Sequence, residues 1–411
     1  MFLDGLKVLD LTRLLPGGVA SAMLTAMGAD VVKVEEPSVG DYLRAMPPTG
    51  PRGNLYFEHL HRGQRSLAAD LRDARGREVM TALAARADVL VESFRPGVMA
   101  RLGLGYDALS AVNPRLVYCS LTAYGQGGQR GQVGQEGQRG RDSPGDATRR
   151  AAGHDLNIMA LSGLLSYLTD RSGRPLAPPL QLADVAAGGL FAVAAVLAAL
   201  VERSRTGRGR HLDVAMLDGL RVLGVLQRVE GAATGRYPAR DDLPLAGNLT
   251  CYNVYATADG GAMALGALEP KFWAAFCEGL GHPEWVPRQF EPSRGQAELT
   301  AEVAGVFTAR TRAEWEEFAR RHDCCLSPVL SPAEAVAHPL AAGRPAGDAF
   351  PVATDPPSGV EEGLSAAPDG LRPAPELGGD TADILRELGY SDENIGAWAE
   401  AGVVRIREGR R

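Results

Sequence analysis

The stretch GLKVLDLTRLLPGGVASAMLTAMGADVVKVEEP, residues 5–37, decides the fold class. Two short apolar runs, 7–11 and 29–35, flank a segment with helical spacing that ends near Gly28. Two strands joined by a helix of this length form a βαβ unit, so the two strands should be parallel. The turn after the first strand, LTRLLPGG at 11–18, lacks the G-x-G-x-x-G pattern of dinucleotide-binding folds.

The same alternation of strand and helix continues to residue 125. We expect a helix over 76–87 and strands over 88–94 and 115–125. This pattern predicts an α/β protein with a doubly wound, Rossmann-like parallel sheet, in which ligands bind at the carboxyl ends of the strands. A chain of 411 residues is also expected to form a second domain. The predicted organisation is a large α/β domain at 1–200, a linker helix region at 201–230, a smaller α+β domain at 231–330 and a C-terminal segment at 331–411 that returns to the large domain.

Composition excludes several functional classes. The net charge of −7 argues against binding to nucleic acid or to an anionic membrane. Five scattered cysteines without metal-ligand spacing predict a reducing compartment and no metal site, and the N-terminus does not resemble a signal peptide, so a cytoplasmic location is expected. The apolar stretch at 185–201 is interpreted as a buried core helix. Gly and Gln recur in a low-complexity insertion at 126–150.

Acid–base candidates lie in apolar, glycine-rich surroundings at three places. They are His154 with Asp155 in AGHDLN, Asp184 in LADVAAGG and Glu269 in GALEPKFW. Each also has a structural alternative: a core histidine beside a capping aspartate, a helix N-cap, and a first-turn carboxylate. Arg95 follows a predicted strand end, where it could contact phosphate or be simply solvated.

Taken together, these segments resemble one family. GLKVLDLTRLLPGG, GADVVKVEEP, DVLVESFRPGVMARLGLGYDAL, AGHDLN, LADVAAGG and GALEPKFW occur in the order found in the family III CoA-transferase superfamily (CaiB/BaiF type). The combination of AGHDLN with GALEPKFW favours the α-methylacyl-CoA racemase branch. The resemblance implies an interlocked homodimer, an acyl-CoA thioester as substrate, and no cofactor apart from the CoA that the substrate carries.

The resemblance also implies roles for the candidates. His154 and Asp184 would exchange protons on opposite faces of the α carbon of a 2-methyl-branched acyl-CoA, with Glu269 orienting His154. The backbone N–H of Asp155 would stabilise the enolate oxygen. Two alternatives stay open: a CoA-transferase that uses Asp184 as nucleophile to form a mixed anhydride, and a non-catalytic acyl-CoA-binding protein.

Contacts with CoA are likewise implied by the resemblance. Glu36 stands where the racemases carry an arginine that contacts CoA, and Lys33 is expected to compensate in part. The remaining predicted contacts are Ala69, Asp70, Leu71, Arg72, Arg95, Gly153, Asn157 and Ile158.

Overall fold

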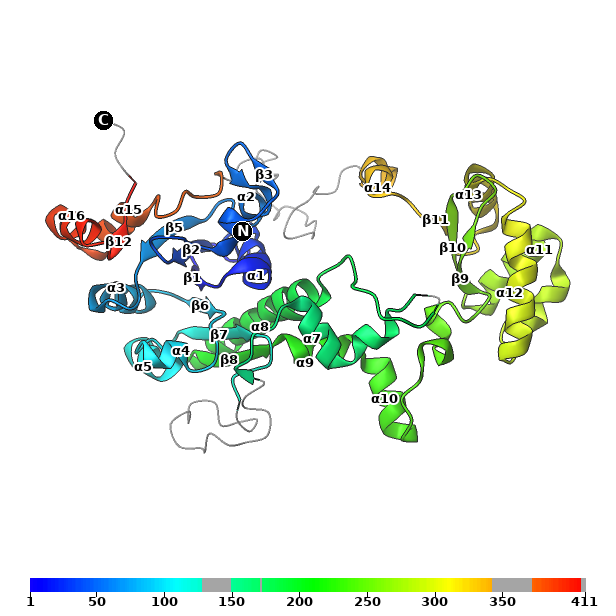
Figure 1. Ribbon diagram of the computed structural model, residues 1–411, viewed down its shortest axis with the longest axis horizontal. Helices are drawn as coiled ribbons and strands as arrows, with labels where there is room; N and C mark the ends of the chain where they lie inside the picture. The colour runs from blue at the N-terminus through cyan, green and yellow to red at the C-terminus, as the bar shows by residue number, and fades with distance from the viewer. Residues whose placement is uncertain (128–148, 171, 342–371, 408–411) are drawn as a thin grey trace. The chain divides into compact units, whose positions relative to one another are not determined.

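The computed structural model describes residues 1–127, 149–170, 172–341 and 372–407 (Figure 1). The chain divides into two compact units, one formed by Met1–Gly224 with Gly347–Arg411 and the other by Val225–Ala346. Most of the predicted Gly-Gln-rich insertion, from 128 to 148, lies outside the described residues.

A seven-stranded sheet forms the centre of the first unit, with the order β12-β5-β2-β1-β6-β7-β8. Only the β12–β5 pair is antiparallel within this sheet, so the α/β class with a parallel βαβ unit is confirmed. The strands are β1 (Lys7–Leu11), β2 (Asp30–Glu35), β5 (Arg65–Ala69), β6 (Val89–Glu92), β7 (Val117–Thr122), β8 (Arg210–Ala215) and β12 (Val404–Arg405).

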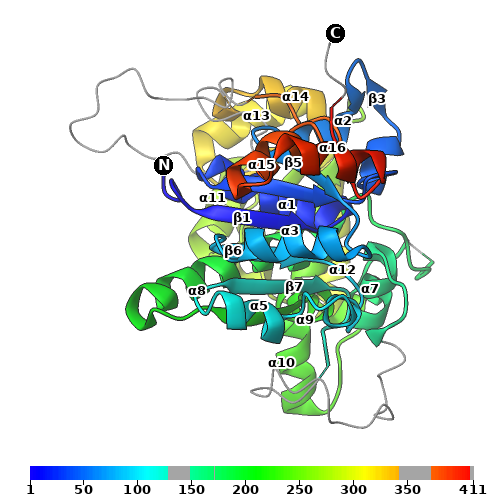
Figure 2. The same ribbon diagram turned by 90° about the vertical axis from the view of Figure 1, so that its left-hand side faces the viewer.

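Helices cover both faces of this sheet, because alternate strand residues point to opposite sides. Val8 and Val31 belong to one apolar cluster, and their neighbours Leu9 and Val32 belong to another. The first cluster includes residues of α1 (Leu14–Ala26), η3 (Leu182–Leu190), α8 (Phe191–Thr206) and α9 (Met216–Leu223). The second includes residues of α3 (Ala74–Ala84), α4 (Val98–Arg101), α5 (Tyr106–Val112), α15 (Thr381–Leu388) and α16 (Asp392–Glu400); α3 and α15 lie in front of the sheet in Figure 2.

The boundary between the units differs from the linker expected over 201–230. Residues 210–215 form β8, which pairs with β7 at six registered positions from Val117↔Arg210 to Thr122↔Ala215. The sequence over 201–230 contains both strand and helix patterns, and the pairing with β7 is what places residues 210–215 in the sheet. The first unit therefore extends to Gly224, and α10 (Val225–Thr234) begins the second.

One continuous helical stretch within the described ranges, Leu182–Thr206, is long and apolar enough to cross a membrane by length and composition alone. Its inward residues, among them Ala183, Ala187, Val193 and Val196, are buried in the first apolar cluster. This packing is typical of a core helix in an α/β protein.

The second unit is built on an antiparallel sheet of β9 (Tyr252–Ala256), β10 (Ala262–Gly266) and β11 (Leu326–Pro328). Trp273, Phe276, Phe307 and Trp315 fill its core, with the Phe307 and Trp315 ring centroids 4.2 Å apart. Its main helices are α11 (Pro270–Leu280), α12 (Ser293–Phe307), α13 (Arg312–His322) and α14 (Pro332–Ala337).

The other described elements are short. They are β3 (Thr49–Gly50), β4 (Gly53–Asn54), α2 (Leu55–Leu60), α7 (Asp155–Ser162), η1 (Tyr42–Ala45), η2 (Leu164–Tyr167), η4 (Arg240–Asp242), η5 (Pro244–Ala246), η6 (Pro283–Arg288) and η7 (Pro339–Ala341).

Candidate active site

A groove of about 490 Å³ lies at the carboxyl ends of β1, β2, β5 and β6. This is the switch point of the sheet, where the chain leaves β1 toward β2 on one side and β6 lies on the other, and open α/β sheets bind ligands there. Four of the predicted contacts line it together: Ala69, Asp70, Leu71 and Arg72.

Two arginines bring positive charge to this groove. Arg72 holds Asp70 through both carboxylate oxygens, at 2.8 and 3.1 Å, and lies 3.6 Å from Glu36. Arg13 donates to the Tyr42 hydroxyl at 3.0 Å, and its guanidinium lies 5.0 Å from the Tyr42 ring centroid. Arg13 was not among the predicted contacts, although its place two residues after the first strand was the available signal.

Lys33 does not reach the groove, so the prediction that it contacts CoA is wrong. Its side chain is 0% exposed, and its ammonium lies 3.3 Å from Asp10, 3.2 Å from Asp41 and 2.7 Å from the Thr12 carbonyl oxygen. Burial alone would lower the pKa of Lys33, but the two carboxylates raise it, so the ammonium stays charged. Its partners use all three donors of the amine.

The N-terminus of α1 is already occupied by a carboxylate of this chain. Both oxygens of Asp41 accept the backbone N–H of Leu14, at 3.1 and 3.2 Å. Leu14 has φ +62°, in the left-handed region, where glycine is usual. A dinucleotide fold leaves this helix end free for pyrophosphate. The absence of the G-x-G-x-x-G pattern therefore agrees with the structure, in which the Asp41 carboxylate occupies this helix end.

Two helices distant in sequence bring His154, Asp155 and Asp184 together. Asp155 is the first residue of α7, and its carboxylate accepts the backbone N–H groups of Ala183 and Asp184, at 2.7 and 3.0 Å. Asp184 lies in the first turn of η3, a π-helix, and such helices are frequent at functional sites. His154 is the exposed N-cap residue of α7.

The pKa of Asp184 is raised toward neutral pH. This pKa is about 6: burial is the largest cause of the rise, the adjacent Asp155 charge acts in the same direction, and His154 opposes both. A carboxyl group with this pKa exchanges protons readily near neutral pH.

Small residues allow η3 to approach its neighbours closely. A Cβ on Gly189 would lie 2.8 Å from Val19 of α1, and one on Gly219 would lie 2.5 Å from the Ala187 carbonyl oxygen. The glycine pair in LADVAAGG therefore serves packing, which holds the Asp184 turn in place.

The other predicted contacts near α7 have different positions. Gly153 lies against Tyr124, whose hydroxyl oxygen would be 2.3 Å from a Cβ at that position. Asn157 is exposed and accepts the backbone N–H of His154 at 3.1 Å. Ile158 is 0% exposed in the core, so its predicted role as a substrate contact is wrong. Ile158 and Met159 lie on the face of α7 that packs into the first apolar cluster.

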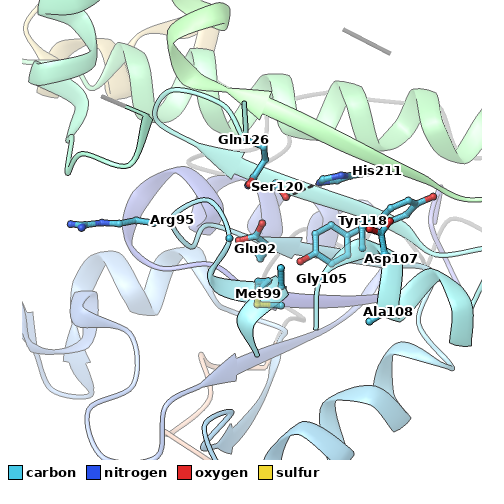
Figure 3. Close-up of a pocket in the computed structure, with 13 residues that line it drawn as sticks. Glu92, Arg95, Met99, Gly105, Asp107, Ala108, Tyr118, Ser120, Gln126 and His211 are labelled. Atoms are coloured by element: carbon cyan, nitrogen blue, oxygen red, sulfur yellow. Dashed lines mark hydrogen bonds between the residues drawn. The ribbon is translucent and has the colours of Figure 1, made fainter. Parts of the chain in front are cut away.

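Arg95 lines a separate cavity of about 160 Å³ (Figure 3). Glu92, Ser120 and His211 also line it, and the Ser120 hydroxyl lies 3.0 Å from His211 Nε2. Burial lowers the pKa of His211 to about 4, so the ring is neutral at pH 7. In Figure 3 the guanidinium of Arg95 points away from the other labelled residues.

Glu269 belongs to the second unit. It is the exposed N-cap residue of α11 and is followed by Pro270. Burial is the largest cause of the raised pKa of the Cys325 thiol, and the charge of Glu269 raises it further. Among the residues with described positions, no group of three His, Cys, Asp or Glu side chains is arranged to hold a metal ion.

Comparison with known proteins places this geometry in a family. The CoA-transferase family III model matches residues 3–381. Alpha-methylacyl-CoA racemase of Mus musculus is 36% identical over 96% of this chain and 95% of its own length. Acetyl-CoA:oxalate CoA-transferase of Acetobacter aceti is 32% identical over 83% of this chain and 84% of its own. The crystal structure of a CaiB/BaiF family protein from Brucella suis matches with a TM-score of 0.72 and 28% identity, covering 94% of this chain and 98% of that one. The chain therefore belongs to CoA-transferase family III.

Proposed function

We propose that this protein is an acyl-CoA racemase that inverts the α carbon of a 2-methyl-branched acyl-CoA. A proton would leave one face of that carbon and another would arrive on the opposite face, with an enolate between the two steps. The groove at the strand ends would bind the CoA portion, with Arg13 and Arg72 facing its phosphates.

The carrying observation is that α7 and η3 bring His154 and Asp184 together, with the Asp184 pKa raised to about 6. Inversion needs two groups that exchange protons near neutrality, one basic while the other is protonated. An ordinary surface aspartate is too weak a base for this role. The burial of Asp184 beside Asp155 supplies the needed basicity.

The enolate oxygen needs a hydrogen-bond donor. Asp155 is the first residue of α7, so its backbone N–H has no acceptor within the helix. Such donors at a helix start stabilise negative charge that develops on an oxygen. Because His154 directly precedes this N–H, the imidazole of His154 and the backbone N–H of Asp155 could act on the same thioester.

The proposal includes a cytoplasmic, interlocked homodimer. Leu156, Leu161 and Leu180 are 46%, 59% and 65% exposed, and an apolar surface of this kind beside the site supports association with another chain. In such a dimer, Glu269 of one chain would orient His154 of the other. The identity of 36% with a racemase supports the racemase branch.

CoA transfer is the second candidate, and one feature of Asp184 favours it. The side chain is only half-buried, and a carboxylate with a pKa of about 6 is ionised above that pH, as attack on a thioester requires. This reaction would use Asp184 without His154. The relative from Acetobacter aceti, at 32% identity, is a transferase by name.

Solvent-deuterium exchange tests the proposal. A single-epimer 2-methylacyl-CoA is incubated in deuterated water, and label at the α carbon is followed together with configuration. We expect label uptake with epimerisation in the native protein, and loss of both in His154→Ala and in Asp184→Ala. His282→Ala and Asp383→Ala, at surface ion pairs remote in sequence, are matched controls that should keep activity.

A parallel reaction with an acyl-CoA donor and free carboxylic acids separates the alternatives. New thioesters without α-exchange, lost in Asp184→Ala but retained in His154→Ala, would refute the racemase and establish the transferase. CoA binding with neither reaction would identify a non-catalytic binding protein.

A further inference from the structure

The side chain of Asp155 makes contacts that its backbone role does not explain. Its Oδ1 accepts the N–H of Ala183 at 2.7 Å and the N–H of Asp184 at 3.0 Å, 28 and 29 residues along the chain. The first N–H groups of a helix have no acceptors inside the helix. Asp155 therefore supplies a cap to η3 from a different helix.

This cap connects three groups of the proposed reaction. His154 precedes Asp155, and its own backbone N–H is held by Asn157 at 3.1 Å. On the other side, the carboxylate binds the backbone N–H of Asp184 itself. The Asp155 side chain thus links the residue next to His154 to the backbone of Asp184 through two hydrogen bonds, in addition to the apolar packing of α7 against η3.

We propose that the carboxylate of Asp155 is a positioning residue that holds α7 against the first turn of η3 and thereby sets Asp184 opposite His154. This inference rests on the proposed proton exchange at the α carbon. This role of the Asp155 carboxylate is separate from the proposed role of its backbone N–H, because every substitution at this position except proline keeps that N–H.

The charge of Asp155 has a second effect that geometry alone would not give. It raises the pKa of Asp184 beyond what burial does, whereas His154 lowers it. Of the other elements that pack against η3, α1 carries no titratable side chain and Asp218 and Arg221 of α9 pair with each other at 2.6 Å. The remaining charged or titratable side chains on packed elements are Arg210, His211 and Asp213 of β8 and Glu202, Arg203 and Arg205 of α8.

Two substitutions separate position from charge. Asp155→Asn keeps an acceptor oxygen for the two N–H groups and removes the charge, whereas Asp155→Ala removes both. Asp73→Asn is the matched control, because Asp73 also caps a helix, α3, through the Arg75 N–H at 2.8 Å and lies on the opposite face of the sheet.

The assay measures kcat and KM for α-deuterium exchange across pH. For Asp155→Asn we expect the acid limb of the profile to move to lower pH by up to about one unit, with KM within about twofold of the native value. For Asp155→Ala we expect kcat to fall by about 10- to 100-fold, because the two groups are no longer held in register. Native kcat in Asp155→Ala, or an unmoved acid limb in Asp155→Asn, would overturn the inference.

Amide hydrogen exchange supplies a readout that does not depend on activity. In Asp155→Ala, the backbone N–H groups at 183 and 184 should exchange faster, whereas Asp155→Asn and Asp73→Asn should keep native protection there. Unchanged protection in Asp155→Ala would overturn the positioning role. If the native protein exchanges no α proton, the proposed function fails, and the amide measurement alone then decides whether Asp155 positions Asp184.

Discussion

One buried histidine should make this protein less stable in mild acid, because between pH 6.5 and 4 its ring binds a proton only in the unfolded chain. His61 is 0% exposed, and its Nδ1 lies 2.8 Å from the Gln64 side-chain oxygen, which can only accept. The proton is therefore on Nδ1, and Nε2 has no hydrogen-bond partner among the described residues. Burial lowers the pKa of His61 from 6.5 to about 4, and the nearby Lys33 charge contributes in the same direction.

The sign and size of the effect follow from these values. His61 is neutral when folded, while the unfolded chain binds a proton below its ordinary pKa of 6.5. His61 therefore does not lower the free energy of unfolding above pH 6.5. The free energy of unfolding decreases as the pH drops from 6.5 to 4, and below pH 4 the loss due to His61 is constant. At one pKa unit per 1.4 kcal/mol, the loss is about 2 kcal/mol at pH 5 and about 3 kcal/mol below pH 4.

Urea unfolding at pH 7.5 and pH 5, followed by far-UV circular dichroism, measures this loss. His61→Asn keeps a side-chain N–H for Gln64 and does not titrate in this range. The native protein should lose about 2 kcal/mol more unfolding free energy between the two pH values than His61→Asn does. All other titrating groups, including His211, are shared and cancel in this difference. Equal losses in the two proteins would refute the assignment of a neutral, buried His61.

Three further outcomes are expected. Lys33→Met should cost about 3–5 kcal/mol in urea unfolding, because two buried carboxylates lose their counter-charge, and a loss below about 1 kcal/mol would contradict this. Gly219→Ala should lower the free energy of unfolding by about 1–3 kcal/mol, because its Cβ would meet a carbonyl oxygen at 2.5 Å. Gly305→Ala, with open space around it, should be neutral or stabilising in the same urea unfolding experiment. Co-expressed Asp184→Ala and Glu269→Ala chains should regain about a quarter of native exchange activity if Glu269 acts across the subunit boundary, because mixed dimers then contain one intact site. No recovery would place Glu269 in the site of its own chain, whereas native activity of the Glu269→Ala chain by itself would place Glu269 outside the reaction.

Much of the fold was predictable because the information is local. The apolar run at 7–11 became β1 with the same bounds, and 29–35 became β2 with one residue less. Strand and helix periods depend on backbone geometry within a few residues, so a sequence pattern reports them directly. The four residues Ala69, Asp70, Leu71 and Arg72, which the family resemblance implied as contacts, line one groove because the ends of parallel strands meet at one edge of a sheet.

Charge partners could not be predicted in the same way. Lys33 looked like a ligand-binding cation beside Glu36, yet it faces the interior and neutralises Asp10 and Asp41. Ile158 was a substrate contact by the family resemblance, yet the rotation of its helix turns it into the core. Which way a side chain points depends on the packing of its element against others, and local sequence does not contain that packing.

By itself the sequence determined the parallel α/β class, the family and the candidates His154, Asp184 and Glu269. The tertiary structure alone decided that the Asp155 carboxylate caps η3, that Asp184 is buried enough to have a pKa of about 6, and that Arg13 faces the groove. The physical reason is that backbone preferences act between neighbouring residues. Burial, hydrogen bonding and charge pairing arise from contacts between residues that folding alone brings together, such as Asp155 and Asp184.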